Sequence, residues 1–305
     1  GAGRFAAAAQ LLSPPTPSEP PFAIRDLIQA PLRQDILGPV AVALDQQTQQ
    51  LGSLHVLKAD PGAGSEQLAT AFMQEIEGLS LLRSHLPPLD YGQALGSFYV
   101  AHTPSLGFDR SQLLHTILAS RQPWPLANVM ALMDSLLAQL APFHEQQQPH
   151  GGIRADAFVQ VGNAIKLVDS GLGKRVLMRL SQQSAEYRKR LLAERDYLPL
   201  EQRIGRLVMS SDLYAVGLVG LQALTGQSLA TLMGRSGIDW QRHADVPSEV
   251  ADWFNSMVSG NQIERYEQAI AARAALPAVV QANAVSTPNF RVGGVSEIAN
   301  SEIAK

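Results

Sequence analysis

Few residue patterns in this chain of 305 residues match those of known reactive or metal-binding sites. His144 and His150 are six positions apart, whereas two histidines that bind zinc from one helix face are about four apart, and no third ligand is evident. The turn Asp60-Pro61-Gly62-Ala63-Gly64 lacks the spacing of a phosphate-binding loop. No nucleophilic-serine, Walker or dinucleotide motif is present. The absence of cysteine excludes disulfides, thiolate metal sites and thiol catalysis.

The composition is that of an ordinary globular protein. There are 24 Lys and Arg against 27 Asp and Glu, and 46% of the residues are hydrophobic. This balance differs from that of disordered chains and lacks the basic excess of a dedicated nucleic-acid binder. The longest apolar stretch, Leu213 to Leu224, is too short to span a membrane and predicts a buried helix. We therefore expect one or two domains, a cytoplasmic location, no bound nucleic acid and no membrane span.

Hydrophobic periodicity predicts a small sheet-rich region followed by a larger helical one. One apolar stripe, formed by Leu68, Phe72, Ile76, Leu79 and Leu82, predicts a helix over 66–82 inside the sheet-rich region. Strands are expected at 40–45, before 59 and at 97–102. After Ser105 we expect a helix over 126–143, two short strands within 158–168, and mostly helix over 176–276.

The two ends of the chain differ from the rest. Residues 13–21 contain five prolines in nine positions, which favours an extended spacer. The start, Gly1-Ala2-Gly3-Arg4, lacks an initiator Met, so we expect a processed segment over 1–21. Residues 281–305 are poor in large apolar side chains and are expected to form a flexible tail.

Seven segments, in order over about residues 27–277, resemble the protein kinase fold, especially that of bacterial Ser/Thr kinases. They are Val56-Leu57-Lys58 (the strand lysine), Glu75 (the glutamate of the N-lobe helix), His150 to Ala157 (a degraded catalytic loop), Lys166 to Gly171 (the metal-binding Asp-Phe-Gly motif with Ser170 in its middle), Tyr197 to Gln202 (the end of the activation segment), Ser211 to Gly217 (the buried C-lobe helix) and Arg265. The resemblance implies an α+β, bilobal fold, with a β-rich N-lobe over 22–104 and an α-helical C-lobe over 105–280.

The departures from the kinase pattern concern the catalytic residues. The resemblance places Gly152 where kinases have the catalytic Asp, and Ala157 where they have a magnesium-binding Asn. Arg154 replaces the loop lysine, which keeps the charge but not the compact shape. General-base assistance contributes about 10²–10⁴-fold, so these losses should leave little phosphoryl transfer. Asp156, four residues further on, is the one candidate replacement base.

The nucleotide site implied by the resemblance is also incomplete. The three loop glycines would fall at Arg33, Asp35 and Gly38, and only Gly38 survives. Two interpretations of the remaining groups stay open. In one, Lys58, Glu75, Asp169, Gly38 and Arg154 hold ATP at low affinity, with one Mg²⁺ on Asp169. In the other, Lys58 forms an ion pair with Glu75 or Asp169 that serves only to fix the angle between the lobes.

The activation segment is basic in a slightly acidic chain. Between Asp169 and Glu201 lie seven basic and three acidic residues, and apolar residues recur at near-helical spacing. One interpretation is a solvated basic face packed on the C-lobe. We nevertheless expect Arg188, Lys189 and Arg190 to meet an acidic protein partner. Glu201, Asp212 and Arg265 are expected to be structural, as in kinases.

The sequence therefore predicts a catalytically inactive kinase-like domain, or pseudokinase, that acts as a protein-interaction, scaffold or regulatory module and requires no cofactor. A weakly active Ser/Thr kinase with an atypical catalytic loop is the first alternative. A structural subunit of a larger assembly is the second.

Overall fold

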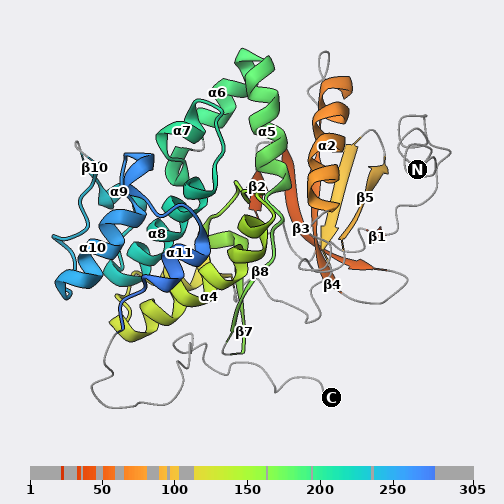
Figure 1. Ribbon diagram of the computed structural model, residues 1–305. Coiled ribbons are helices and arrows are strands. Elements are labelled where there is room, and N and C mark those ends of the chain that lie inside the picture. Colours follow the sequence, from red (N-terminus) through yellow and green to blue (C-terminus); the bar gives the residue numbers. More distant parts are fainter. Residues whose placement is uncertain are drawn as a thin grey trace, which may run out of the picture.

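The computed structural model describes residues 22–23, 33–35, 37–45, 51–58, 65–80, 89–94, 97–102, 113–162, 164–193, 195–234 and 237–278 (Figure 1). The proline-rich segment over 1–21 and the tail over 281–305 lie outside the described residues.

The N-terminal part is a six-stranded antiparallel sheet in the order β1-β3-β4-β6-β5, with β2 also pairing with β3. The strands are β1 (Phe22–Ala23), β2 (Arg33–Asp35), β3 (Gly38–Asp45), β4 (Leu51–Leu57), β5 (Leu89–Ala94) and β6 (Ser97–His102). The three expected strands are confirmed as β3, β4 and β6. Periodicity did not reveal β5, whose sequence LDYGQA contains a glycine and polar residues.

One helix, α2 (Ser65–Ser80), packs on this sheet through the predicted apolar stripe. Leu68, Phe72, Ile76 and Leu79 are buried there, and the rings of Phe72 and Phe98 lie 5.0 Å apart between centroids. The predicted helix is confirmed to within two residues at its end.

The C-terminal part is helical apart from two small hairpins. Its helices are α3 (Leu114–Leu118), α4 (Leu126–Glu145), α5 (Leu172–Gln183), α6 (Ala185–Ala193), α7 (Leu200–Arg203), α8 (Met209–Thr225), α9 (Leu229–Leu232), α10 (Ser248–Met257) and α11 (Ala269–Ala274). Short 3₁₀ turns cover Ala155–Ala157, Arg195–Tyr197 and Gln262–Glu264. The hairpins pair β7 (Phe158–Val161) with β8 (Ala164–Leu167), and β9 (Met233–Gly234) with β10 (Gly237–Ile238).

Helix α8 forms the centre of this part, as its apolar sequence predicted. Nearly all of its residues are buried, and α4, α10 and α11 pack around it. Trp240 and Trp253 are buried in the same core, and Trp124 packs against it, which agrees with their expected core roles. Among the described helices, α4 alone is long and apolar enough to cross a membrane by composition, and its buried residues pack inside this core.

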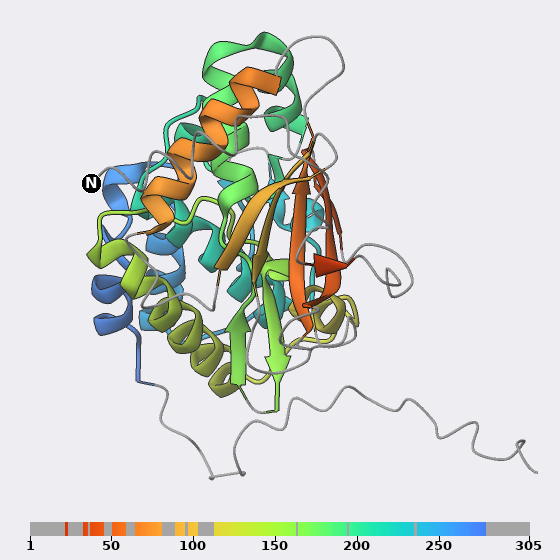
Figure 2. The same cartoon turned by 90° about the vertical axis from the view of Figure 1, so that its right-hand side faces the viewer.

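A second core joins the two parts. Residues from β4, α2 and β6 cluster with buried residues of α5 and α6, including Leu172, Val176, Leu180 and Leu191. We call this cluster the cross-lobe core. Figures 1 and 2 show α2 and α5 next to each other, so the activation segment packs directly on the N-terminal helix.

Candidate functional site

The loop over 150–157 is held by one buried carboxylate of α8. The Oδ2 atom of Asp212 accepts a hydrogen bond of 2.6 Å from the backbone N–H of His150, and Oδ1 accepts one of 2.7 Å from that of Gly151. The Nε2 atom of His144 lies 3.1 Å from the same carboxylate. Since Asp212 is 1% exposed, these bonds form in a dry environment and fix the start of the loop.

His150 is fully buried and its two ring nitrogens have different roles. Nε2 lies 2.8 Å from the carbonyl oxygen of Asp169 and must donate to it, while Nδ1 accepts from the backbone N–H of Gly152 at 3.2 Å. Burial lowers the pKa of His150, and the nearby Asp212 and Asp169 only partly oppose this effect. The ring is therefore neutral and bridges the loop to the segment that begins at Asp169.

That segment turns directly into helix α5. The Oδ1 atom of Asp169 accepts the backbone N–H of Gly171 at 2.8 Å, and the buried Ser170 hydroxyl accepts that of Leu172 at 3.3 Å. Gly171 has φ +70°, and a Cβ atom there would lie 2.1 Å from the carbonyl oxygen of His150. Glycine is therefore required at the point where α5 begins.

Glu201 and Arg265 form a second buried anchor. Their two hydrogen bonds measure 2.8 and 2.9 Å, and the Ser211 hydroxyl donates a third to Glu201 at 2.8 Å. Burial alone would raise the pKa of Glu201, but the bonds from Arg265 and Ser211 outweigh it and lower the pKa. The carboxylate is thus ionised and joins α7 to α8 and to the loop before α11.

The chain as a whole is similar to known proteins. No protein-family model matches the chain. The serine/threonine-protein kinase PknL of Mycobacterium tuberculosis is 29% identical over 283 residues, which cover 88% of this chain and 68% of that protein. The serine/threonine-protein kinase B of Synechocystis is 25% identical over 210 residues, which cover 65% of this chain and 36% of that protein. The solved kinase domain of PknI from M. tuberculosis superposes with a TM-score of 0.57 at 18% identity, covering 80% of this chain and 91% of that domain.

This chain is a protein-kinase-like domain related to bacterial Ser/Thr kinases. The expected bilobal α+β fold is confirmed.

Gly152, where the resemblance to kinases places the catalytic Asp, lies close to the backbone that begins α5. A Cβ atom at Gly152 would lie 3.0 Å from the Cα atom of Gly171 and 3.5 Å from the Cβ atom of Lys174. Ala157 is fully buried and has no metal-binding atom. A cavity of about 190 Å³ opens beside Gly152 and is lined in part by Arg154, Lys174 and Tyr197. Basic and hydroxyl groups from the loop, from α5 and from the turn Arg195–Tyr197 thus surround a position that has no side chain.

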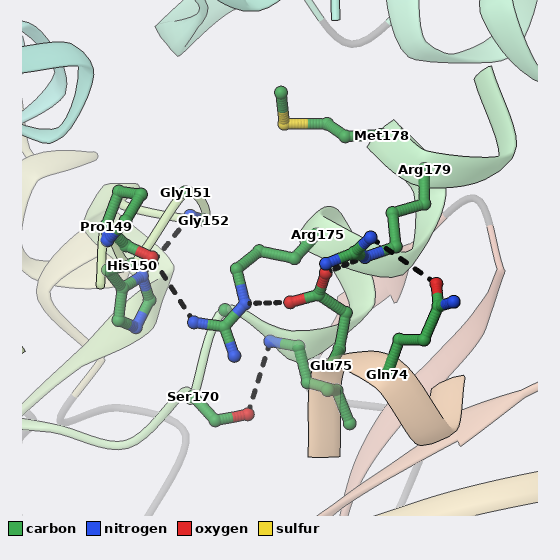
Figure 3. Close-up of polar contacts among 12 residues, drawn as sticks. Gln74, Glu75, Pro149, His150, Gly151, Gly152, Ser170, Arg175, Met178 and Arg179 are labelled. Atoms are coloured by element: carbon green, nitrogen blue, oxygen red, sulfur yellow. Dashed lines mark hydrogen bonds and ion pairs between the residues drawn. The ribbon is translucent and has the colours of Figure 1, made fainter. Parts of the chain in front are cut away.

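Glu75 of α2 binds two arginines of α5 (Figure 3). Its Oε2 atom lies 2.8 Å from Nε of Arg175, and its Oε1 atom contacts Nε of Arg179. Arg175 is 4% exposed and also donates to the carbonyl oxygen of Pro149 at 3.2 Å. Burial lowers the pKa of Arg175, whereas the Glu75 carboxylate opposes that shift. The cluster ties α2 to α5 and to the loop before His150.

The structure does not bring Lys58 to this cluster. Lys58 follows the end of β4 with an exposed side chain, and both oxygens of Glu75 are engaged by α5. The expected Lys58–Glu75 pair is therefore replaced by Glu75–Arg175 and Glu75–Arg179. Three residues earlier, His55 is 5% exposed, and a Cβ atom at Gly173 would lie 2.0 Å from its ring. His55 is thus a polar residue of β4 that faces the first turn of α5.

Gly38 has a structural role in the β2–β3 hairpin. Its φ is +146°, and a Cβ atom there would lie 2.0 Å from the carbonyl oxygen of Val56. The glycine therefore permits close packing of β3 on β4. This packing explains a glycine at position 38 without any contact to a phosphate. Before it, Leu37 is 3% exposed and belongs to the cross-lobe core.

The remaining predicted residues lie on three elements. Arg154 pairs with Asp156 at 3.1 Å inside the loop. The activation segment is helical, as its spacing predicted, and Val176, Leu177, Leu180, Tyr187 and Leu191 are all buried. Arg188 and Lys189 are exposed on α6, whereas Arg190 is half-buried and pairs with Glu186 at 3.3 Å.

Sequence reasoning missed His55, Arg175 and Arg179. A signal for His55 exists, because alternation along β4 places it on the same face as the buried Leu57, opposite to Val56 and Lys58. The arginines are four apart, which places them on one face of α5, but only the fold shows that this face meets Glu75.

Proposed function

We propose that this domain is a pseudokinase: it transfers no phosphoryl group and acts as a protein-interaction module. The observation that carries the proposal is the contact between Gly152 and Gly171. Kinases orient the substrate hydroxyl with an Asp at the position of Gly152. Here that position has no side chain, and a Cβ atom there would lie only 3.0 Å from the Cα atom of Gly171, at the start of α5.

The residues around the cleft do not fit a nucleotide with Mg²⁺. Kinases hold the metal ions with an Asp and an Asn, and Ala157 replaces the Asn. Glu75 is bound by α5, and Lys58 points to solvent. The hairpin that should cover the phosphates carries Asp35, a carboxylate of the same sign as the ligand. We therefore infer that the domain needs no ATP and binds it weakly or not at all.

Phosphotransfer with radiolabelled ATP and Mg²⁺ or Mn²⁺ tests the first part of the proposal. We expect no label above background on generic protein substrates or on the domain itself. The matched control is Asp169→Asn, which removes the one metal-binding side chain that remains. Label that is present in the wild type and absent from this variant would overturn the proposal, whereas label present in both comes from a contaminating kinase.

A weak kinase that uses Asp156 as its base is the second candidate. The observation in its favour is that Asp156 lies in the catalytic loop beside Arg154, with their side chains 3.1 Å apart. Asp169-dependent label that vanishes in Asp156→Asn would support this candidate.

The interaction surface we propose is the exposed face of α6. Arg188 and Lys189 are both exposed there, while Glu186 already neutralises Arg190. Arg188 donates to the carbonyl oxygen of Ser181 at 3.3 Å, and among the described residues neither Arg188 nor Lys189 forms a salt bridge with a carboxylate. A partner with an acidic face would find these two positive charges on a helix fixed by the buried Tyr187 and Leu191.

Charge reversal tests this surface. Arg188→Glu/Lys189→Glu should weaken capture of partners from native extract and reduce the salt dependence of capture, with little change in melting temperature. The control Arg121→Glu/Arg242→Glu makes the same charge change at exposed positions elsewhere. Capture that is equal for both folded variants would exclude α6 as the surface.

A further inference from the structure

The β2–β3 hairpin is fixed against the cleft. Its tip residue Leu37 is buried in the cross-lobe core together with Leu57 of β4 and Leu172 of α5. The carbonyl oxygen of Leu37 accepts the backbone N–H of Lys58 at 2.6 Å. These contacts set the position of Asp35, the last residue of β2, which pairs with Gly38.

Asp35 lies between two basic side chains from different lobes. Its Oδ2 atom is 3.6 Å from Nε2 of His55 on β4, and its Oδ1 atom is 4.0 Å from Nη1 of Arg154 in the catalytic loop. The side chains of Asp35 and His55 are only 16% and 6% exposed. Arg154 also pairs through its other terminal nitrogen, Nη2, with Asp156 at 3.1 Å. A carboxylate of the N-lobe thus sits among basic groups of both lobes.

The same three elements surround the nucleotide phosphates in kinases. There, a glycine-rich loop covers the phosphates, a lysine on the neighbouring strand contacts them, and the catalytic loop lies opposite. In this chain the hairpin provides Asp35, the strand provides His55 and the loop provides Arg154. Carboxylates and phosphates offer basic side chains the same kind of oxygen acceptor.

We propose that Asp35 is a resident anion in the phosphate subsite, and that its removal uncovers a site for polyphosphate formed by His55 and Arg154. The carboxylate of Asp35 occupies the position of a ligand, so the cleft is closed without nucleotide. The inference deepens the proposed function and rests on it in one respect, since both require a cleft that holds no nucleotide in the wild type.

Binding of tripolyphosphate without metal, measured by titration calorimetry near pH 7, tests the inference. Asp35→Asn keeps the shape of the side chain and removes its charge. We expect this variant to bind about tenfold more tightly than the wild type, or better, because a like charge inside the site is lost. The matched control Asp239→Asn removes a carboxylate that pairs with an arginine elsewhere, Arg242 at 2.9 Å, and should bind like the wild type.

A third variant identifies the site. Adding Arg154→Met to Asp35→Asn should abolish the gain, because Arg154 is then absent from the subsite. The inference is overturned if folded Asp35→Asn shows no gain, if Asp239→Asn shows an equal gain, or if the gain survives Arg154→Met. Phosphotransfer does not enter this test, so Asp169-dependent label would overturn the pseudokinase proposal separately from any result with tripolyphosphate.

Discussion

Gly152 permits a close contact between two backbone segments. With no side chain at 152, the backbone of Gly171 approaches closely and α5 begins beside the loop. His150 fixes the same contact from the other side, through its bonds to Asp169 and Gly152. The absence of a side chain at 152 and the helical start of the segment are therefore parts of one packing arrangement.

Restoring the aspartate should destabilise the domain and give no activity. Gly152→Asp forces side-chain atoms against the Gly171 backbone, and such overpacking costs about 1–3 kcal/mol. Chemical denaturation measures the loss. Gly260→Asp, at an open and exposed position, should change stability by less than about 0.5 kcal/mol. A Gly152→Asp variant as stable as the wild type would contradict the packing argument.

The buried His150 predicts a loss of stability in mild acid. Its pKa is lowered in the folded state, so below its ordinary value of 6.5 the unfolded chain binds a proton that the folded chain does not. The unfolding free energy should fall as pH drops through that window, by at most about 1.4 kcal/mol per pH unit for this one proton. Urea titrations from pH 7.5 to 5 measure the slope.

His150→Gln should flatten that slope, whatever its effect on stability at pH 7.5. His115→Gln, at an exposed position on α3, should leave the slope unchanged. Glu201, whose pKa lies below its ordinary value of 4.5, contributes only at lower pH and does not interfere.

Helix α5 is the element by which this site differs most from the expected kinase site. It begins immediately after Asp169-Ser170-Gly171, places Gly173 under His55 and presents Arg175 and Arg179 to Glu75. The segment that is an open substrate platform in an active kinase is here a helix packed on α2.

The two arginines should contribute very differently to this packing. Glu75→Gln leaves the buried Arg175 without its anion, which costs about 3–5 kcal/mol for a buried pair. Arg179→Gln removes a partner whose side chain is 46% exposed, and the loss should be about 0–1 kcal/mol. Denaturation of the two variants side by side checks this. Equal effects would mean that Arg175 does not depend on Glu75.

Elements with strong periodicity could be predicted from the sequence, and contacts between elements could not. The stripe on α2, the strand β6 and the buried α8 follow directly from their apolar residues. The order of motifs gave the fold, and Asp212, Glu201 and Arg265 followed from it. The partner of Glu75 could not be predicted in this way. Lys58 and Arg175 are both cations that could pair with it, and only the packing of α5 decides between them. His55 was missed because the resemblance to kinases pointed to Lys58, three residues further along the chain, as the basic residue of this strand.

At the scale of the whole molecule, the lobes share a hydrophobic core. Leu37, Leu57 and Phe72 from the N-lobe cluster with Val176 and other α5 and α6 residues. The ion pairs of Glu75 and Asp35 cross the same boundary. Separating the lobes would expose this apolar surface to water, which is unfavourable.

The domain should therefore unfold in one step. All three tryptophans, Trp124, Trp240 and Trp253, lie in the C-lobe, so their fluorescence reports on that lobe. Hydrogen exchange of amides in β4 and β6 reports on the sheet. We expect the two probes to give coincident urea midpoints. A sheet that loses protection well before the fluorescence changes would show that the lobes are independent.

The shared core has a consequence for signalling. An active kinase opens and closes its lobes in each cycle, and regulators act by shifting that equilibrium. In this domain, opening the lobes would have to separate Leu37 and Leu57 from the α5 residues they pack with. We expect a constitutive adaptor, whose output depends on how many copies the cell makes and on how tightly each copy holds its partner.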